Sequence, residues 1–219
     1  MKNIRIYQIL LAIAVVVIAI LTIRSTVDEK QSQEAESIKI ENMETKNEAT
    51  GKWRKITPQE IKNNPVTLCE NLLALASGKE GDMNAMTIGW MTLGWLWADP
   101  VAVVYVSPDR HTFGFMESNE YFTITAFPEE DRDKLMYIGT HSGRDGDKIK
   151  DAGLTVEYTE LGNPTFTNGT LMIECRKIQS QQIDSSVMDK DIRKRFYEDY
   201  KQTVHHLYVG EIVNVWVKE

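Results

Sequence analysis

The sequence predicts a mainly β domain, a closed or partly closed barrel with helices inserted between its strands. Two observations support this prediction. Segments rich in β-branched and aromatic residues recur along the chain after Met83, and such segments favour strands. Helix-forming segments interrupt them without the regular strand–helix alternation of a parallel sheet. The N-terminal residues differ in composition, so we expect the folded domain to begin near Trp53.

Length and charge limit the function classes. The chain has 219 residues, of which 42% are hydrophobic, enough for one mid-sized domain with an appendage. Its net charge of -7 argues against a nucleic-acid partner, which would require a basic face. The two cysteines, Cys69 and Cys175, are too few for a disulfide framework or a metal knuckle. We expect two buried free thiols, although an exported domain could also pair them.

Residues 1–24 are predicted to be a membrane anchor or signal segment. Lys2 and Arg5 precede an uncharged run from Ile6 to Ile23, which as a helix would be about 27 Å long and could span a bilayer. The preceding positive charges favour a cytoplasmic N-terminus. We therefore expect a transmembrane helix through residues 6–23 and an extracytoplasmic domain.

A cleaved signal peptide, which would leave the domain secreted, is the alternative. The run is longer than the usual apolar region of about 7–15 residues and lacks a good Ala-x-Ala site. Residues 25–52 contain no aromatic residue or proline and are predicted to form a polar spacer, either a flexible tether or a loose helix. Residues 53–219 form the predicted domain.

The domain opens with a helix start. Thr57 can cap a helix, Pro58 suits its first position, and Glu60 completes a capping box. This helix is expected to end at residues 63–65. Residues 66–76 are then expected to form a strand or short buried segment, and residues 78–81 a turn. Two strands are expected at residues 83–91 and 101–106, joined by a link at residues 94–100.

The second half alternates helices and strands irregularly. A helical turn and three helices are expected at residues 112–116, 128–138, 143–152 and 189–200. Ile192, Phe196 and Tyr200 fall on one face of the last of these helices. Further strands are expected at residues 121–126, 155–159, 171–182 and 205–218.

Four segments in order resemble the flavin reductase-like family. Asn84-Ala-Met-Thr87, followed by Trp90, looks like its first flavin-contacting strand, and residues 103–112 are similar to the next strand and its phosphate-side loop. Residues 142–148, Ser-Gly-Arg-Asp-Gly-Asp-Lys, and 205–211, His-His-Leu-Tyr-Val-Gly-Glu, resemble two further family segments. The resemblance extends from Trp53 to the C-terminus. It implies an FMN-binding split β-barrel of Greek-key type and a homodimer with each FMN at the subunit interface.

The resemblance also implies the site. Asn84, Met86, Thr87 and Trp90 would lie at the isoalloxazine ring and ribityl chain, and Ser107, Arg110 and Thr112 toward the phosphate. Thr125 and Ala126 would line the ring, and Ser142, Arg144 and Lys148 would lie near the cofactor tail. His205 would stand near the flavin face, where a nicotinamide or another donor approaches.

The residue chemistry agrees with a phosphorylated ligand. Hydroxyls, backbone N–H groups and arginine bind phosphate, and Ser107, Arg110 and Thr112 supply such groups within one loop. Each loop alone is as well explained as a solvated turn, and His205 alone as a structural histidine. His206 should face away from His205, because adjacent strand residues alternate. Asp145-Gly-Asp147 suggests a calcium loop, but the remaining ligand spacing is missing, so we expect no metal.

The predicted function is that of an oxidoreductase that passes hydride from NAD(P)H to flavin and electrons on to an acceptor. The cofactor performs this chemistry, so no side chain is assigned a catalytic role. An exported domain would lack NAD(P)H and would take electrons from a membrane donor. The alternative is therefore a non-enzymatic, membrane-tethered flavin-binding or electron-transfer module. A split barrel that binds another cofactor, such as haem, or none, is a third possibility.

Overall fold

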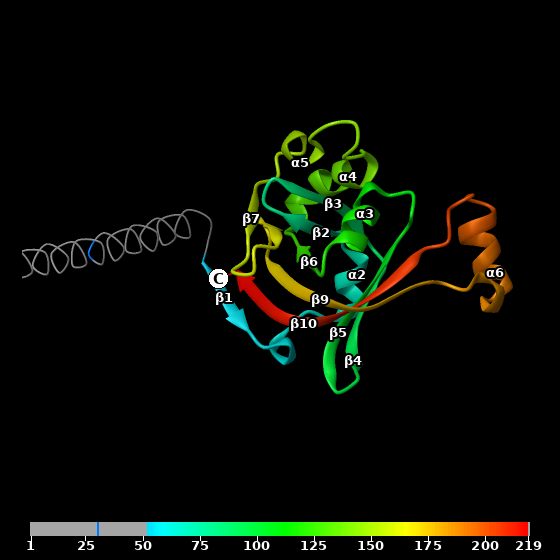
Figure 1. Ribbon diagram of the computed structural model, residues 1–219, viewed down its shortest axis with the longest axis horizontal. Coiled ribbons are helices and arrows are strands. Elements are labelled where there is room, and N and C mark those ends of the chain that lie inside the picture. The colour runs from blue at the N-terminus through cyan, green and yellow to red at the C-terminus, as the bar shows by residue number, and fades with distance from the viewer. Residues whose placement is uncertain (1–29, 31–51, 219) are drawn as a thin grey trace, which may run out of the picture. The chain divides into compact units, whose positions relative to one another are not determined.

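The computed structural model describes Lys30 and residues 52–218 (Figure 1). The predicted anchor and nearly all of the predicted spacer lie outside these residues. Within the described part of the chain, no helix is long and apolar enough to cross a membrane.

The domain is mainly β, as predicted. An antiparallel sheet has the order β3-β2-β6-β9-β10-β5-β4, with β1 also paired to β10, and β7 pairs with β8 in a small second sheet. The strands are β1 (Trp53–Ile56), β2 (Leu73–Lys79), β3 (Asp82–Ile88), β4 (Met91–Leu96), β5 (Asp99–Val106), β6 (Tyr121–Ala126), β7 (Val156–Tyr158), β8 (Pro164–Phe166), β9 (Leu171–Gln182) and β10 (His206–Lys218).

Helices connect several of these strands. They are α2 (Pro65–Glu70), α3 (His111–Ser118), α4 (Arg132–Thr140), α5 (Lys148–Asp151) and α6 (Lys190–Arg193), a π-helix (Lys194–Glu198), and 3-10 helices at Pro58–Glu60, Glu129–Asp131 and Ser185–Val187. Figure 1 shows α6 apart from the other helices, at the far ends of β9 and β10.

Strand β10 organises the sheet. One of its edges pairs with β9, while the other pairs first with β5, over residues 206–211, and then with β1, over residues 215–218. Because β10 changes partner along this edge, β5 and β1 each pair with a different part of β10. Gly210 is required at a register shift in this strand, because a Cβ there would lie 2.5 Å from the Phe122 ring and 2.6 Å from Cys175.

The alternation of β2 separates two cores. Leu73 and Leu75 pack into the larger cluster, whereas Ala74 and Ala76 pack against the cluster that includes Leu135 of α4. Small residues on the second face let the helix approach the sheet closely. This packing brings the C-terminal end of α4 beside β3.

Several element predictions are corrected. The opening helix ends at Glu60, whose carboxylate accepts hydrogen bonds from the Thr57 backbone N–H and hydroxyl, both at 2.8 Å. Asn64 and Pro65 begin α2 rather than ending a helix: Pro65 is its first residue, and the Asn64 side chain accepts a hydrogen bond from the Val66 N–H at 2.9 Å. Part of the segment at 66–76 is therefore helix.

The link predicted at residues 94–100 is instead a β-hairpin. β4 and β5 pair across a turn at Trp97 and Ala98, which have φ of 53° and 68°. The prediction missed this hairpin because such two-residue turns favour Asn-Gly rather than Trp-Ala. The strand at 171–182 and that at 121–126 are confirmed, and both cysteines are free thiols, with Cys175 buried and Cys69 half-buried.

Candidate functional site

A cavity of about 490 Å³ opens where β3, the end of β5, the end of α4 and the start of β10 meet. We call it the His205 cavity. Five residues predicted for the site line it: Met86, Thr87, Ser107, Arg110 and His205. Its other lining residues, which were not predicted, are Leu72, Gly89, Asp109, Met136, Gly139, Thr140 and Gln202.

Close packing of β3 on α4 builds one wall of this cavity. The Thr87 hydroxyl donates a hydrogen bond to the Leu135 carbonyl. A Cβ on Gly139 would lie 3.0 Å from the Thr87 side chain, so the glycine permits this approach. The wall therefore exposes helix backbone beside the threonine.

Arg110 joins the loop after β5 to the same helix. Its backbone N–H bonds the Ser107 carbonyl at 3.0 Å, forming the turn, and its Nη2 donates to the Gly139 carbonyl at 2.6 Å. Burial lowers the pKa of the guanidinium. The side chain also lines a neighbouring cavity of about 390 Å³ together with His111 and Arg144, so Arg110 stands between the two spaces.

Lys148 is a buried cation at the end of α4. Only 5% of it is exposed, and its ammonium donates to the carbonyls of Ile138, at 2.8 Å, and His141, at 3.1 Å. Burial, and secondly the charge of Arg110, lower its pKa to about 8. The last carbonyls of a helix have no partner within the helix, and Lys148 supplies donors to this end.

Arg144 and His111 extend the positive region. Arg144 Nη1 donates to the Asp109 carbonyl at 3.2 Å, and the Ser142 hydroxyl accepts the Arg144 backbone N–H at 3.2 Å. Burial, followed by the charges of Arg144 and Lys148, lowers the pKa of His111. Cationic groups thus gather around the 107–112 loop of a chain that is acidic overall.

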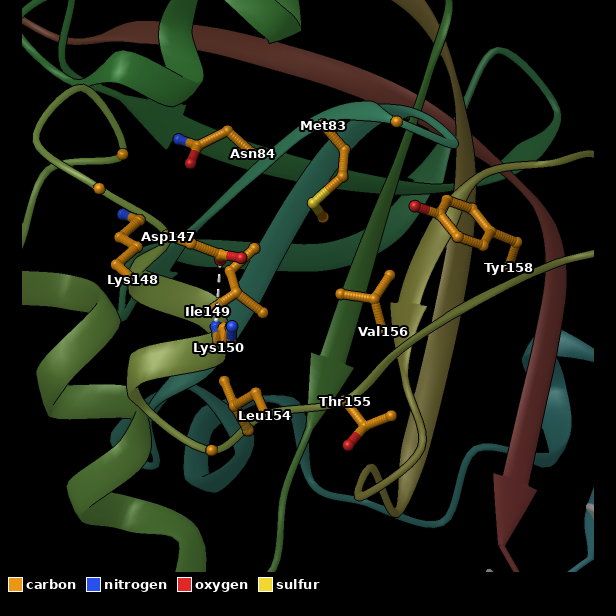
Figure 2. Close-up of a pocket in the computed structure, with 14 residues that line it drawn as sticks. Met83, Asn84, Asp147, Lys148, Ile149, Lys150, Leu154, Thr155, Val156 and Tyr158 are labelled. Atoms are coloured by element: carbon orange, nitrogen blue, oxygen red, sulfur yellow. Dashed lines mark hydrogen bonds between the residues drawn. The ribbon is translucent and has the colours of Figure 1, made fainter.

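A second cavity, of about 750 Å³, adjoins this region (Figure 2). Asn84 and Lys148 lie toward one end of it and Tyr158 toward the other. The Asn84 amide donates to the Thr112 hydroxyl at 2.8 Å, and both side chains are buried. Asn84 and Thr112 therefore hold the loop against β3 and are not among the residues that line the His205 cavity.

The remaining predicted residues lie elsewhere. The Thr125 and Thr165 hydroxyls are 3.0 Å apart and buried, and Ala126 belongs to the larger core cluster. Neither Thr125 nor Ala126 is among the lining residues of the His205 cavity. Trp90 is 41% exposed, and the centroid of its indole ring lies 4.8 Å from that of the His205 ring.

His205 lines the cavity and also carries a buried polar atom without a partner in the described part of the chain. Its Nδ1 is buried without a hydrogen-bond partner among the described residues. Burial lowers its pKa, with an opposing effect of Asp109. His206 packs on the opposite side, against the rings of Phe113 and Tyr208, which confirms the predicted alternation.

The end of α4 was the part of the site that sequence reasoning missed. Met136, Gly139 and Thr140 belong to a segment that reads as an ordinary amphipathic helix, and only its position beside Ser142 hinted at a role. The Gly139-Thr140 pair just before the Ser142 motif was the available signal.

Comparison with protein families matches residues 66–219 to the flavin reductase like domain. No curated protein matches the chain. Solved structures with the same fold include a flavoredoxin from Methanosarcina acetivorans, at 23% identity and a TM-score of 0.54, with 68% of this chain and 69% of that chain covered. An FMN-binding protein from Thermus thermophilus has 21% identity and a TM-score of 0.55, with 75% and 78% covered.

A third structure of this fold is a Streptomyces globisporus NADH:FAD oxidoreductase. It has 11% identity and a TM-score of 0.50, with 66% of this chain and 74% of that chain covered. These likenesses establish the split-barrel fold.

Proposed function

The chain belongs to the flavin reductase-like family, and on that premise we propose that it is an FMN-binding oxidoreductase of the flavin reductase type. It would pass hydride from NAD(P)H to flavin and electrons on to an acceptor; in an extracytoplasmic location, a membrane electron donor would take the place of NAD(P)H. When bound, FMN would supply this redox chemistry, while the protein binds and orients it. The observation that carries the proposal is the His205 cavity, which five of the predicted site residues line, with the cations Arg110, His111 and Arg144 around the adjoining cavity.

The residues present fit FMN. The cavity wall offers helix backbone and the apolar side chains of Leu72, Met86 and Met136, which suit the faces of a flat ring. Arg110 lines both this cavity and the neighbouring one. His111 and Arg144 also line the neighbouring cavity, and such cationic donors suit a phosphate. The His205 side chain lines the same cavity, beside the Trp90 indole at 4.8 Å between ring centroids.

This fit assigns roles to side chains. Met86 and Thr87 would hold the ring end, and Ser107, Arg110 and Arg144 the phosphate end. Asn84, Thr112 and Lys148 would act indirectly, by fixing the loop and the end of α4 through the hydrogen bonds described above. His205 would border the ring and help to exclude water.

We also propose a homodimer and a membrane location. Trp95 and Trp97 at the tip of the β4–β5 hairpin are 65% and 63% exposed, and large exposed aromatic side chains are enriched in protein interfaces. Residues 6–23 would anchor the chain in a membrane, with the domain extracytoplasmic or, after cleavage, secreted. The uncharged run and its preceding positive charges support this location.

The test uses the full-length protein in detergent. Its visible spectrum after incubation with FMN and removal of free flavin reports cofactor binding, and oxidation of NADH and NADPH reports activity. Bound FMN with nicotinamide turnover is expected. Bound FMN without turnover would favour an electron-transfer module, and failure to retain FMN would overturn both functions.

A further inference from the structure

The segment between β9 and β10 forms an apolar cleft against the barrel. The cleft has a volume of about 390 Å³, and its lining includes Trp90, Tyr105, Ile183, Phe196 and Tyr197. Among the residues that the structure describes, no charged side chain lines it. A ligand in this cleft must therefore be held by ring contacts and apolar burial.

The cleft shares a wall with the His205 cavity. The His205 ring lies 4.8 Å, centroid to centroid, from the Trp90 indole and 5.8 Å from the Tyr197 ring. Trp90 and Tyr197 line the cleft, while His205 lines the cavity. One layer of aromatic side chains thus separates the two spaces.

The helical part of the segment holds the outer side of the cleft. Phe196, in the π-helix, meets the Trp90 indole edge-on at 5.5 Å, and Ile192 of α6 leaves 47% of its surface exposed. π-helical turns are rare and frequent at functional sites. Apolar surface left open to water, beside an aromatic wall, is what a binding site for a flat apolar molecule requires.

We propose that this cleft binds the electron acceptor and that the acceptor is a quinone. The inference rests on the proposed function, which supplies the reductant. A dinucleotide carries a charged pyrophosphate, and no cation is among the described residues that line the cleft; the Arg195 guanidinium beside it is stacked on the Phe196 ring, 4.9 Å from the ring centroid. A quinone is planar and uncharged, and remains uncharged after accepting two electrons and two protons. With NAD(P)H as the donor, the reaction balances as NAD(P)H + H⁺ + quinone → NAD(P)⁺ + hydroquinone.

Direct binding tests the cleft without relying on turnover. Menadione binding to FMN-free, full-length protein in detergent is measured by equilibrium dialysis. Ile192→Glu places a charge at the cleft, and Val187→Glu places the same charge on the same segment at a residue that is 81% exposed and does not line the cleft. Menadione that partitions into the micelles contributes equally to both variants.

The expected result is that Ile192→Glu weakens menadione binding about tenfold or more relative to the wild type, while Val187→Glu leaves it unchanged. Phe196→Ala, a second variant that removes the ring contact with Trp90, should weaken binding in the same direction. Equal binding by wild type, Ile192→Glu and Phe196→Ala would overturn the inference.

Activity of the FMN-loaded protein is the second measurement. The half-saturating menadione concentration should rise about tenfold in Ile192→Glu, with no change in the NAD(P)H-dependent reduction of ferricyanide. A protein that binds menadione in the cleft but retains no FMN would refute the proposed function alone. One that retains FMN but reduces menadione equally well in both glutamate variants would refute the quinone cleft alone.

Discussion

Arg110 and Lys148 donate to adjacent carbonyls at the end of one helix. The Arg110 guanidinium contacts the Gly139 oxygen at 2.6 Å, and the Lys148 ammonium contacts the Ile138 oxygen at 2.8 Å. A helix C-terminus carries partial negative charge, so it favours both cations. The sequence predicts that both side chains lie toward the phosphate end of FMN, but in the structure their donors bind the carbonyls of α4.

Arg110→Ala should weaken FMN binding by about 1.5–3 kcal/mol if the guanidinium makes a charge-assisted phosphate contact. It should also lower the melting temperature, because the Gly139 carbonyl loses its donor. Titration calorimetry with FMN and thermal unfolding of the FMN-free protein separate the two effects. A lower melting temperature with unchanged FMN affinity would make Arg110 a structural cap only.

Lys148 should make stability depend on pH. Its pKa is about 8 in the folded protein, against an ordinary value of 10.5. Between these values the unfolded chain binds more protons than the folded one, so stability should rise with pH from about 8 to about 10.5. Thermal unfolding across this range should show the rise in the wild type but not in Lys148→Met. Parallel profiles for both proteins would exclude the assignment to Lys148.

Gly139→Ala should destabilise the domain by about 1–3 kcal/mol, because the new methyl group would press on Thr87 across the β3–α4 packing. Gly114→Ala is the matched control. Gly114 is also helical, but a Cβ there meets nothing within 4 Å, so alanine should be neutral or stabilise by about 0.5–1 kcal/mol. Urea unfolding compares the two, and an equal effect of both substitutions would contradict the close approach.

Glu174→Gln should cost about 2–4 kcal/mol of folding free energy. The carboxylate is fully buried and accepts hydrogen bonds from Thr159 at 2.5 Å, Asn163 at 2.8 Å and Asn214 at 2.6 Å. An amide in its place would turn an N–H group toward one of these donors. Glu160→Gln, at an exposed position, should change little in the same urea titration. A loss of folding free energy below about 0.5 kcal/mol for Glu174→Gln would contradict the prediction, because it would show that the three hydrogen bonds rearrange around the amide.

Trp97→Asn should weaken self-association if the hairpin tip contacts a second copy. Asparagine tolerates the positive φ of 53° at this position, so the turn should persist while the exposed indole is removed. Leu161→Asn removes another exposed apolar side chain, 54% exposed, from a different loop. Sedimentation equilibrium should show weaker association for Trp97→Asn only. Identical dimers from both variants would place the interface elsewhere.

Much of the fold could be predicted from local pattern. The strands at residues 121–126 and 171–182 are rich in β-branched and aromatic residues, and the turn at residues 78–81 is marked by glycine. The short strands β1 and β8 were missed, because four and three residues carry too little pattern to indicate a strand. They form through pairing with β10 and β7.

The candidate site was predicted in part. Met86, Thr87, Ser107, Arg110 and His205 are brought together by strand and loop positions that the motifs marked. Thr125 lies in the buried interior, hydrogen-bonded to Thr165, a contact between residues 40 apart that no local pattern reveals. The end of α4 joined the site through packing against β3.

The sequence by itself determined the strand-rich composition, the order of the four motifs and their chemistry, because these depend on residue types and short spacings. Only the tertiary structure decided which cationic side chains remain available to bind a ligand. Lys148 and Arg110 look equally suited to a phosphate in the sequence, yet burial directs both to the carbonyls of α4, and only Arg110 also lines the His205 cavity. A buried cation must satisfy its own hydrogen bonds before it can serve a ligand, and the fold sets which partners lie within reach.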